Sequence, residues 1–251
     1  MLGPNEPPVY ELLREDGNSP FLLTADHAGR VIPQALGDLG VPPSEMDRHI
    51  AWDIGIASVT RQLSAALNAT AILQTYSRLV IDCNRNPQVP SAFPEVSEAT
   101  PIPGNQGLSD ADRLARQQAI FDPYHREIIR LISARPRTVY VAMHSFTPVY
   151  LGKVRPMHAA MLYNRNPRLS KHLAALLAEE PGMVVAENDP YSVGDGTDYG
   201  VPVHAERGGL EYLEIEIRQD LIADAVGQQE WAARLARLLP QALNRLETAT
   251  A

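Results

Sequence analysis

Two histidines, His27 and His144, stand at the ends of apolar stretches of chain, FLLTA (residues 21–25) and TVYVAM (residues 138–143). Each stretch has the composition of a buried strand, so a sheet would hold both imidazoles rigidly at its edge. Imidazole is the commonest metal ligand, and catalytic zinc typically binds two or three histidines with or without a carboxylate. Either histidine alone could be a hydrogen-bonded residue at a strand end. Two of them in equivalent places favour a metal site.

Further polar side chains follow the predicted strands at the same kind of position. They form three clusters, Asp26-His27, residues 82–85 and His144-Ser145. Ligands of open α/β sheets bind beyond the carboxyl ends of the strands. The three clusters therefore predict one site at one edge of the sheet.

The elements that must position these residues alternate between strands and helices of 10 or more residues. This alternation predicts a three-layer αβα fold with a mixed, mainly parallel sheet covered on both faces. Ser44 is the predicted N-cap of the first long helix. The predicted strands are 21–25, 69–75, 79–81, 138–143, 159–163, 183–186 and 213–217, and the predicted helices are 44–67, 109–132, 167–180 and 224–246.

Length and composition indicate one packed domain over residues 1–251, since 251 residues is near the upper limit for one hydrophobic core. The chain is 45% hydrophobic and 21% charged, which is ordinary for a globular protein. Residues 1–19 are expected to be a lead-in segment before the first strand. Residues 87–107 contain five prolines and are expected to form a long surface loop.

Charge and cysteine content exclude several classes of function. The formal net charge of -8 disfavours nucleic acid and anionic membranes as partners. The N-terminus lacks a basic start followed by an apolar run, and no stretch approaches the roughly 20 apolar residues of a membrane span, so a cytoplasmic protein is expected. Cys83 is the only cysteine, so a metal must be held mainly by His, Asp and Glu. No nucleophile elbow surrounds Ser145, and no glycine-rich nucleotide motif is present.

Six sequence blocks, taken in order over about residues 20–225, resemble those of the N-formylglutamate amidohydrolases. The blocks are DHAGRVIP (26–33), HIAWDIG (49–55), YSRLVIDCNRNP (76–87), MHSFTP (143–148), NDPY (188–191) and EIEIRQDL (214–221). The order is also similar, more distantly, to that of the zinc carboxypeptidases, which match at His27, at residues 82–85, at His144-Ser145 and at residues 216–218. The resemblance implies a phosphorylase/hydrolase-like α/β fold and metal-assisted hydrolysis of an amide, with Zn²⁺ as the metal.

The third metal ligand departs from the carboxypeptidase pattern. Those enzymes use a glutamate three residues after the first histidine, and Arg30 occupies that position here. Asp53 is our choice, because it is expected on the same helical face as His49, four residues earlier. It could instead be a carboxylate on a helix surface, and three other residues are rivals for the role: Glu45, Asp26 and His49.

Glu216 lies in the apolar run LEIEI, where alternation puts it on one face with Glu214. The functional interpretation makes Glu216 the general base that deprotonates the attacking water and passes the proton to the leaving amine. The alternative is an exposed strand face that carries both glutamates. Arg78 is the arginine chosen to stabilise the oxyanion that develops during attack.

Arginines also suggest how the substrate is held. Arg85 has a planar fork of donors that matches a carboxylate, and Asn84 could add a second contact. Arg78, Arg207 and Arg218 are candidates for a side-chain carboxylate or are arginines on a solvated face. Other expected substrate contacts are Ser145 and three residues of a glycine-rich stretch that could also be a plain surface loop: Asn188, Tyr191 and His204.

The sequence thus predicts a zinc-dependent amidohydrolase of an N-acyl amino acid, with N-formyl-L-glutamate, cleaved to formate and glutamate, as the best candidate. A carboxypeptidase-like enzyme or another N-acyl amino acid metallo-amidase is the alternative. A non-catalytic protein that binds a small molecule is the alternative of a different class, and Arg30 favours it. The ligand types would also accept manganese, cobalt or iron, and the oligomeric state stays open.

Overall fold

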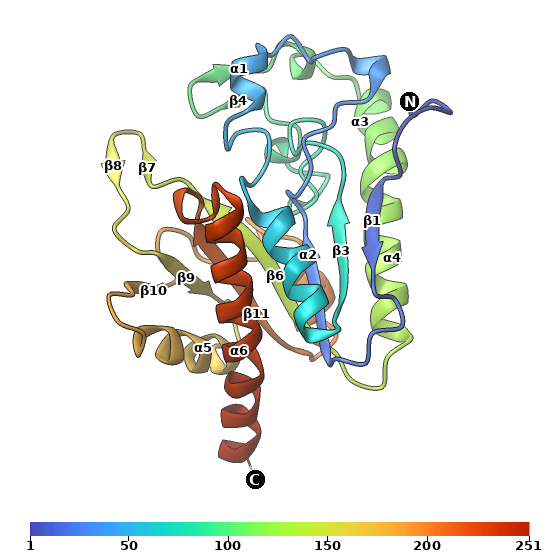
Figure 1. The fold of residues 1–251 in the computed structure, drawn as a ribbon. Helices are drawn as coiled ribbons and strands as arrows, with labels where there is room; N and C mark the ends of the chain where they lie inside the picture. The colour runs from blue at the N-terminus through green and yellow to red at the C-terminus, as the bar shows by residue number, and fades with distance from the viewer. Residues whose placement is uncertain (251) are drawn as a thin grey trace.

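The structure, a computed structural model, describes residues 1–250, and a seven-stranded sheet forms its centre (Figure 1). The strand order is β1-β3-β2-β6-β11-β9-β10. Four of the six neighbouring pairs are parallel, while β1 is antiparallel to β3 and β9 is antiparallel to β11. The predicted mixed, mainly parallel sheet is confirmed. Its strands are β1 (Tyr10–Leu13), β2 (Phe21–Ala25), β3 (Thr70–Gln74), β6 (Val139–Phe146), β9 (Ala159–Leu162), β10 (Val185–Glu187) and β11 (Glu211–Arg218).

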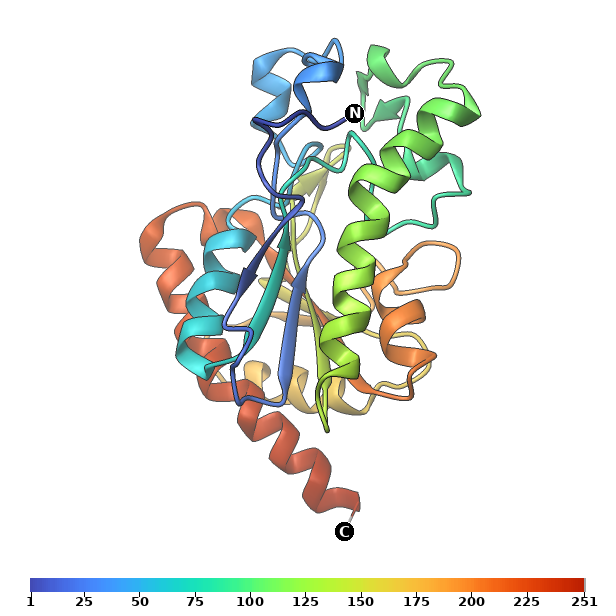
Figure 2. The same ribbon diagram turned by 90° about the vertical axis from the view of Figure 1, so that its right-hand side faces the viewer.

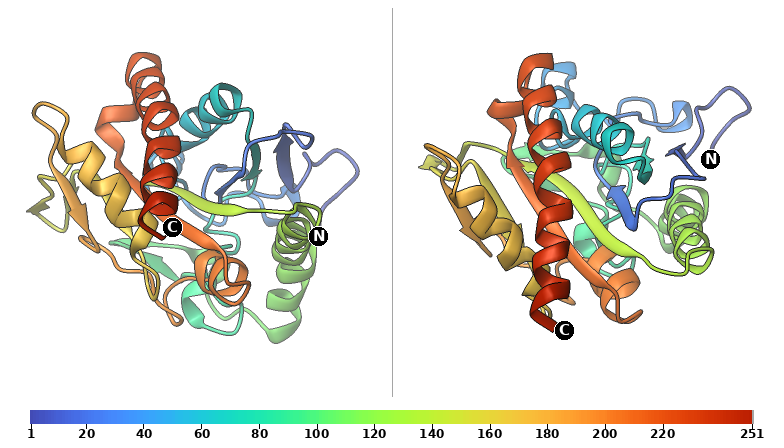
Figure 3. Two further views of the ribbon diagram at one scale, coloured as in Figure 1. Left: turned by 90° about the horizontal axis from the view of Figure 1, so that it is seen from below. Right: turned by 60° about the horizontal axis from the view of Figure 1, so that its bottom comes forward.

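Helices cover both faces of this sheet, which confirms the three layers (Figure 2). One face carries α2 (Ile56–Leu67), α5 (Arg168–Ala178) and α6 (Ala225–Thr250), and α6 runs between α5 and α2 (Figure 3). The other face carries α4 (Asp122–Ser133), which continues α3 (Asp110–Arg116) through a π-helical turn, and the π-helical segment Gly200–Glu206. Within residues 1–250, no helix has both the length and the hydropathy that a membrane span requires.

Strand residues alternate between two hydrophobic cores, as the pleat requires. In β2, Leu23 and Ala25 belong to the core beneath α2, α5 and α6, whereas Leu22 belongs to the core beneath α4. All eight residues of β6 are buried. Because helices cover both faces, strands β2, β6 and β9 are mostly apolar, whereas β11 carries two buried glutamates, Glu214 and Glu216.

The predicted helix over residues 44–67 is wrong in its first half. Only α1 (Pro43–Met46) and α2 are helical, and Pro42 rather than Ser44 is the N-cap of α1. Gly55 interrupts the helix with φ of +81°, and a Cβ at this position would collide with the carbonyl oxygen of Ile222. Asp53 therefore lies in a loop of turns just before α2 and not on a helical face.

Three other elements differ from the prediction. Residues 79–81 form a buried turn in place of a strand, because the Asn105 side chain and not a neighbouring strand binds the carbonyl of Leu79. Strand β6 continues to Phe146, so His144 lies within the strand and not after it. Residues 10–13, to which no element was assigned, form the edge strand β1, which is antiparallel to β3.

Residues 87–107 follow an irregular path with two short 3-10 turns and the two-residue strands β4 (Val96–Ser97) and β5 (Thr100–Pro101). The buried guanidinium of Arg116 donates to the carbonyls of Val80 and Gly104 and to the side chain of Asn105. A second two-stranded sheet, β7 (Val149–Tyr150) with β8 (Lys153–Val154), follows β6. The two irregular regions follow the carboxyl ends of β3 and β6, at the same edge of the sheet as the site described next.

Candidate metal centre and active site

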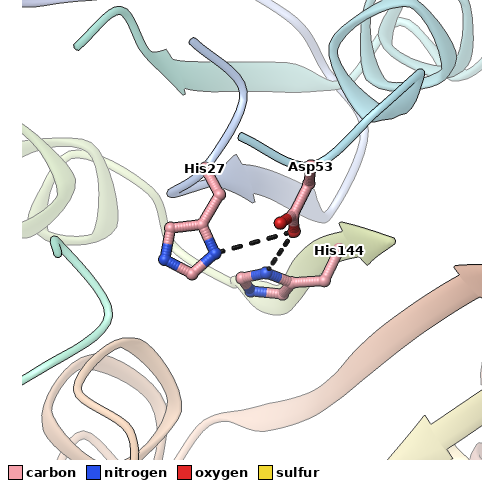
Figure 4. Close-up of side chains that lie close together, drawn as sticks. All are labelled: His27, Asp53 and His144. Carbon is pink, nitrogen blue, oxygen red and sulfur yellow. Dashed lines mark hydrogen bonds and ion pairs between the residues drawn. The ribbon is translucent and has the colours of Figure 1, made fainter. Parts of the chain in front are cut away.

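His27, Asp53 and His144 converge at the carboxyl end of β2 and β6 (Figure 4). Oδ2 of Asp53 lies 3.0 Å from Nδ1 of His144 and 3.6 Å from Nδ1 of His27. The three possible ligand atoms all lie within 4.8 Å of one another, and all three residues are buried. The structure thus brings together the two histidines and the carboxylate that the sequence analysis chose, although Asp53 comes from a loop.

Backbone contacts fix the three residues relative to one another. The amide of Asp53 donates to the carbonyl of His27 at 2.8 Å, and the amide of Ser145 donates to Asp53 Oδ2 at 3.2 Å. Gly29 allows the chain after His27 to approach the end of β3, because a Cβ there would collide with the carbonyl of Thr75. The site is therefore tied to the sheet by main-chain hydrogen bonds.

The carboxylate of Asp82 orients the His27 ring by binding the ring nitrogen that does not face Asp53. Nε2 of His27 lies 2.7 Å from Oδ1 of Asp82, and Arg78 donates from Nε and Nη2 to Oδ2 of the same carboxylate at 3.1 and 2.7 Å. A carboxylate can only accept, so Nε2 of His27 carries the proton and the lone pair of Nδ1 faces Asp53. Metal-bound histidines are oriented in this way by a carboxylate on the other nitrogen.

The pKa values of the buried residues in the centre are set by two opposing effects, burial and the charges of their neighbours. Burial by itself would raise the pKa of Asp53, but the charges and hydrogen bonds of His27 and His144 outweigh it and lower that pKa. Burial likewise opposes charging of His144, yet the hydrogen bond to Asp53 and the negative charge of Glu214 raise its pKa well above the usual range. The centre is built to keep a carboxylate ionised away from water.

The residues present fit a divalent metal ion. Within residues 1–250, Nδ1 of His27 and Nε2 of His144 are buried and have no hydrogen-bond partner. A buried polar atom without a partner costs about 1–3 kcal/mol, which a ligand in the site would remove. Two imidazoles with one carboxylate are a donor set typical of catalytic zinc.

A cavity of about 360 Å³ opens beside this centre. Glu214 and Glu216 of β11 line it, and both are buried, so they do not form an exposed strand face. Glu216 is directly opposite His144 in the parallel pairing of β11 with β6. Burial raises the pKa of each glutamate to about 8. The cavity is lined by His27, His49, Asp53, Arg78, Asn84, Arg85, His144, Ser145, Phe146, Thr147, Leu162, Tyr191, Ser192, Thr197, Asp198, Glu214 and Glu216.

Five residues expected to act on the substrate line the cavity, and each of them also has a hydrogen-bond partner within the protein. Oδ1 of Asn84 accepts from the amides of Tyr199 and Gly200, and its Nδ2 donates to Asp198. Oγ of Ser145 donates to the carbonyl of Ile54. The five are Arg78, Asn84, Arg85, Ser145 and Tyr191.

The other three expected substrate contacts lie outside the cavity. Asn188 accepts from the amide of Tyr163. His204 is buried beneath α4 and lies 2.8 Å from His125. Arg218 donates to the carbonyls of residues 155–157 and to Asp220. Each side chain satisfies a local structural need, which the sequence pattern did not distinguish from substrate binding.

The three alternatives to Asp53 as the third metal ligand do not lie together with the two histidines. Glu45 binds Arg48 and Thr100, and Asp26 accepts from the Tyr124 hydroxyl at 2.7 Å. His49 lines the cavity but is not among the three grouped ligands. Arg30 is half-exposed and pairs with Asp47, so the arginine that favoured a non-catalytic protein does not enter the site.

Sequence reasoning assigned no role to several residues near the cavity. The place of Glu214 at the cavity could have been predicted, because it lies on the same face of its strand as Glu216. Asp198 follows no strand, and its carboxylate at the cavity is held by Asn84 and by the amide of Gly194. Arg155 is buried, packs over the rings of Tyr150 and Tyr191 and donates to the Tyr191 hydroxyl at 2.8 Å. No spacing in the sequence signals these last two.

The model of the N-formylglutamate amidohydrolase family matches residues 19–223. The chain belongs to this family. A gene product from Agrobacterium tumefaciens with a known crystal structure is 38% identical, with a TM-score of 0.94 over 98% of this chain and 99% of that chain. An N-formylglutamate amidohydrolase from Ralstonia eutropha is 18% identical, with a TM-score of 0.64 over 96% of this chain and 98% of that chain, which shows a shared fold. No curated protein matches the sequence.

The pair of His204 and His125 in this family member leads to a prediction about acid stability. His125 Nε2 lies 2.9 Å from the Cys83 carbonyl and must carry the proton there, so its Nδ1 accepts from His204. Burial lowers the pKa of His204 to about 4. The unfolded chain therefore takes up a proton that the folded chain refuses, and stability falls as pH decreases from about 6.5 towards 4.

We expect His204→Gln to reduce the loss of unfolding free energy between pH 7 and pH 5 by about 2 kcal/mol, measured by urea denaturation. His172→Gln on α5 is the matched control and should leave that loss unchanged. An equal loss in wild type and His204→Gln would show that His204 is not held neutral.

Proposed function

We propose that this protein is a metal-dependent amidohydrolase that cleaves the amide of an N-acyl amino acid, with zinc as the metal and N-formyl-L-glutamate as the best candidate substrate. One observation carries the proposal: the buried group His27–Asp53–His144, which has unpartnered imidazole nitrogens, opens onto a cavity that holds Glu216 and two arginines. Zinc held by these residues would polarise the scissile carbonyl and promote the attack of water.

Glu216 supplies the proton transfers of the hydrolysis. It accepts a proton from the attacking water as the oxygen bonds to the acyl carbon, and it donates that proton to the nitrogen as the carbon–nitrogen bond breaks. The products are the acid and the free amino acid. Burial raises the pKa of Glu216 to about 8, which makes the carboxylate a stronger base than an exposed glutamate.

Arg78 stabilises the oxyanion that develops on the carbonyl oxygen. Its Nη1 lies 3.6 Å from Oδ1 of Asp53, and the two hydrogen bonds that Nε and Nη2 donate to Oδ2 of Asp82 fix the orientation of the guanidinium plane. Donors that are oriented before reaction lower the barrier without a cost of reorganisation at the moment of attack.

Arg85 binds the carboxylate of the amino acid portion. Its guanidinium is one-quarter exposed and lies 3.7 Å from Asp198, which is beyond hydrogen-bond distance and leaves donors for a substrate. Asn84 stabilises the side of the cavity next to Arg85, because it binds the Asp198 side chain and the amides of residues 199 and 200. Tyr191, which is 41% exposed, lines the cavity and is oriented by Arg155.

Family membership and the fold shared with the Ralstonia eutropha enzyme support N-formylglutamate as the substrate. A different acyl group or a small peptide is the second candidate, because the cavity carries carboxyls as well as arginines. Assays of N-formyl, N-acetyl and N-succinyl amino acids side by side separate the two. The fastest turnover, measured as kcat/KM, identifies the acyl group.

Metal removal tests the proposal most directly. Elemental analysis of the purified protein should find about one zinc ion per chain, and dialysis against a chelator should abolish turnover because the carbonyl is no longer polarised. Added Zn²⁺ should restore it. Full activity in the metal-free protein would contradict the proposal.

Glu216→Gln should retain zinc and lower kcat by about 10²–10⁴-fold, since glutamine cannot accept the proton of water. Turnover and zinc content are measured on the same preparation. Glu211→Gln, on the same strand but outside the cavity, is the matched control and should behave as wild type. A Glu216→Gln variant with normal kcat would remove this residue as the base.

Arg85→Ala should raise KM for carboxylate substrates by about 10-fold or more and change kcat less, because binding of the amino acid portion is lost. Arg85→Lys should lie between wild type and alanine, since lysine keeps the charge but cannot form the bidentate contact. Steady-state kinetics on the best substrate measure both constants. An unchanged KM in Arg85→Ala would place the carboxylate elsewhere.

A further inference from the structure

We propose that Tyr191 is a catalytic residue whose hydroxyl donates a hydrogen bond to the oxygen of the scissile carbonyl, and that Arg155 is the positioning residue that directs this hydroxyl. The inference rests on the proposed function, because it names a second donor for the oxyanion that Arg78 also stabilises. Two hydrogen bonds that Arg155 donates from a single nitrogen atom carry the inference.

Arg155 fixes the direction in which the Tyr191 hydroxyl can donate. Nη1 of Arg155 lies 2.8 Å from the hydroxyl oxygen, and a guanidinium can only donate, so this oxygen is the acceptor. The hydroxyl proton must therefore point away from Arg155. Within residues 1–250, the bond from Arg155 is the only hydrogen bond of this hydroxyl, so its proton has no acceptor in the protein. Tyr191 lines the cavity, where an oxygen of the substrate would accept that proton.

Arg155 is held firmly enough to set this direction. Its side chain is buried, and its Cζ lies 4.9 Å and 4.8 Å from the ring centres of Tyr150 and Tyr191. The main-chain amide of Arg155 donates to the carbonyl of Pro148 at 2.8 Å, and its carbonyl accepts from Arg218 at 3.4 Å. Tyr191 itself is 41% exposed, so its ring is oriented at the cavity chiefly by this buried cation.

The same guanidinium nitrogen places the Tyr191 hydroxyl on the metal side of the cavity. It also donates to the carbonyl of Thr147 at 3.4 Å, and Thr147 directly follows the strand that carries His144. Arg85, the proposed anchor of the substrate carboxylate, comes from the loop after β3 and lies beside Asp198. The scissile carbonyl, which the metal would polarise on the His144 side, is therefore the acceptor that fits the hydroxyl.

The charges that act on Tyr191 agree with this placement. Burial raises the pKa of Tyr191 above its ordinary value, so the hydroxyl keeps its proton at neutral pH. The charge of Glu216 raises that pKa further, whereas the charges of Arg155 and Arg78 lower it. A hydroxyl that accepts from a cation is also polarised by it, which makes the hydroxyl a stronger donor.

Tyr191 acts by hydrogen bonding alone and does not transfer its proton. As water attacks, negative charge develops on the carbonyl oxygen, and the hydroxyl donates to this oxygen more strongly than to the neutral carbonyl. Glu216 carries out both proton transfers, and the charge on the oxygen disappears when the carbon–nitrogen bond breaks. A donor that is oriented before the reaction stabilises the transition state without a cost of reorganisation.

Steady-state kinetics of the zinc-loaded, full-length protein on N-formyl-L-glutamate, or on the fastest substrate of the acyl panel, test the catalytic role. Tyr191→Phe should lower kcat by about 10²–10³-fold and change KM far less, because the bond forms mainly in the transition state. Tyr150→Phe is the matched control, since it removes the hydroxyl of the other ring that packs on Arg155, and its kcat should be unchanged. A normal kcat in Tyr191→Phe overturns the inference. An effect confined to KM also overturns it, because the hydroxyl would then bind the substrate carboxylate.

A double-mutant cycle distinguishes a positioning role of Arg155 from a merely structural one. Arg155→Met should lower kcat, and Arg155→Lys, which keeps a cationic donor, should recover part of the loss. In the double variant Tyr191→Phe/Arg155→Met the two losses should not add, because Arg155 acts through the hydroxyl. Circular dichroism and zinc content verify that each variant is folded and loaded. Additive losses in folded, loaded proteins overturn the positioning role.

A titration without substrate tests the contact between the two residues. The charge of Arg155 lowers the pKa of Tyr191, so one tyrosine should ionise at higher pH in Arg155→Met than in wild type. The ultraviolet absorption of phenolate follows this ionisation. The difference should vanish when both proteins also carry Tyr191→Phe. Identical titrations of wild type and Arg155→Met would show that Arg155 does not direct this hydroxyl.

The outcomes separate this inference from the proposed function. If zinc-loaded wild type cleaves no N-acyl amino acid, the proposed function fails and the oxyanion role fails with it. The titration then still decides whether Arg155 directs Tyr191. If wild type cleaves the substrate and Tyr191→Phe does so at the same rate, the proposed function stands and only this inference fails.

Discussion

The burial of the Asp53 carboxylate is the constraint on which the rest of the site depends. An ionised carboxylate away from water is tolerated only with opposite charge and hydrogen bonds around it. Asp53 meets this requirement with His144, with the amide of Ser145 and with the facing edge of His27. Three segments that are far apart in the chain, the ends of β2 and β6 and the loop before α2, must therefore meet at one carboxylate.

Beyond Asp53, positively and negatively charged side chains alternate, so that each buried charge lies beside one of opposite sign. His27 binds Asp82, and Asp82 binds Arg78, whose guanidinium also lies near Asp53. The charge of Arg78 and that of His27 outweigh burial and hold the pKa of Asp82 well below its usual range. Such a network fixes ring orientation and tautomer in the absence of any ligand. This explains why a set of buried, costly groups can be kept ready for a metal ion.

The glutamates of β11 are buried without such partners of opposite charge. Among residues 1–250, no basic side chain forms an ion pair with Glu214 or Glu216, and burial raises the pKa of each glutamate. They are tolerated because they face a polar cavity rather than the apolar core, which a strand achieves by its alternation. Two carboxyls of raised pKa beside the Asp53 carboxylate, whose pKa is lowered, are the arrangement expected of acid–base chemistry.

The cavity walls are held by contacts that carry no chemistry themselves. Asn84 binds the backbone of residues 199 and 200 and the side chain of Asp198, and Arg155 orients Tyr191. Gly200 permits this approach, since a Cβ there would lie 2.7 Å from the Tyr140 hydroxyl. Residues expected to touch substrate thus serve partly to shape the space that substrate would occupy.

The sequence by itself determined the layered fold, the position of His27 at a strand end and the common face of Glu214 and Glu216. These follow from periods of two and 3.6 residues, which are local properties of the chain. Only the tertiary structure decided that Asp53 reaches the histidines from a loop, that His204 is buried against His125 of α4, and that the carboxyl of Asp198 faces Arg85. Each of these depends on which distant segments pack together and which buried polar groups remain to be satisfied, and neither is encoded in local spacing.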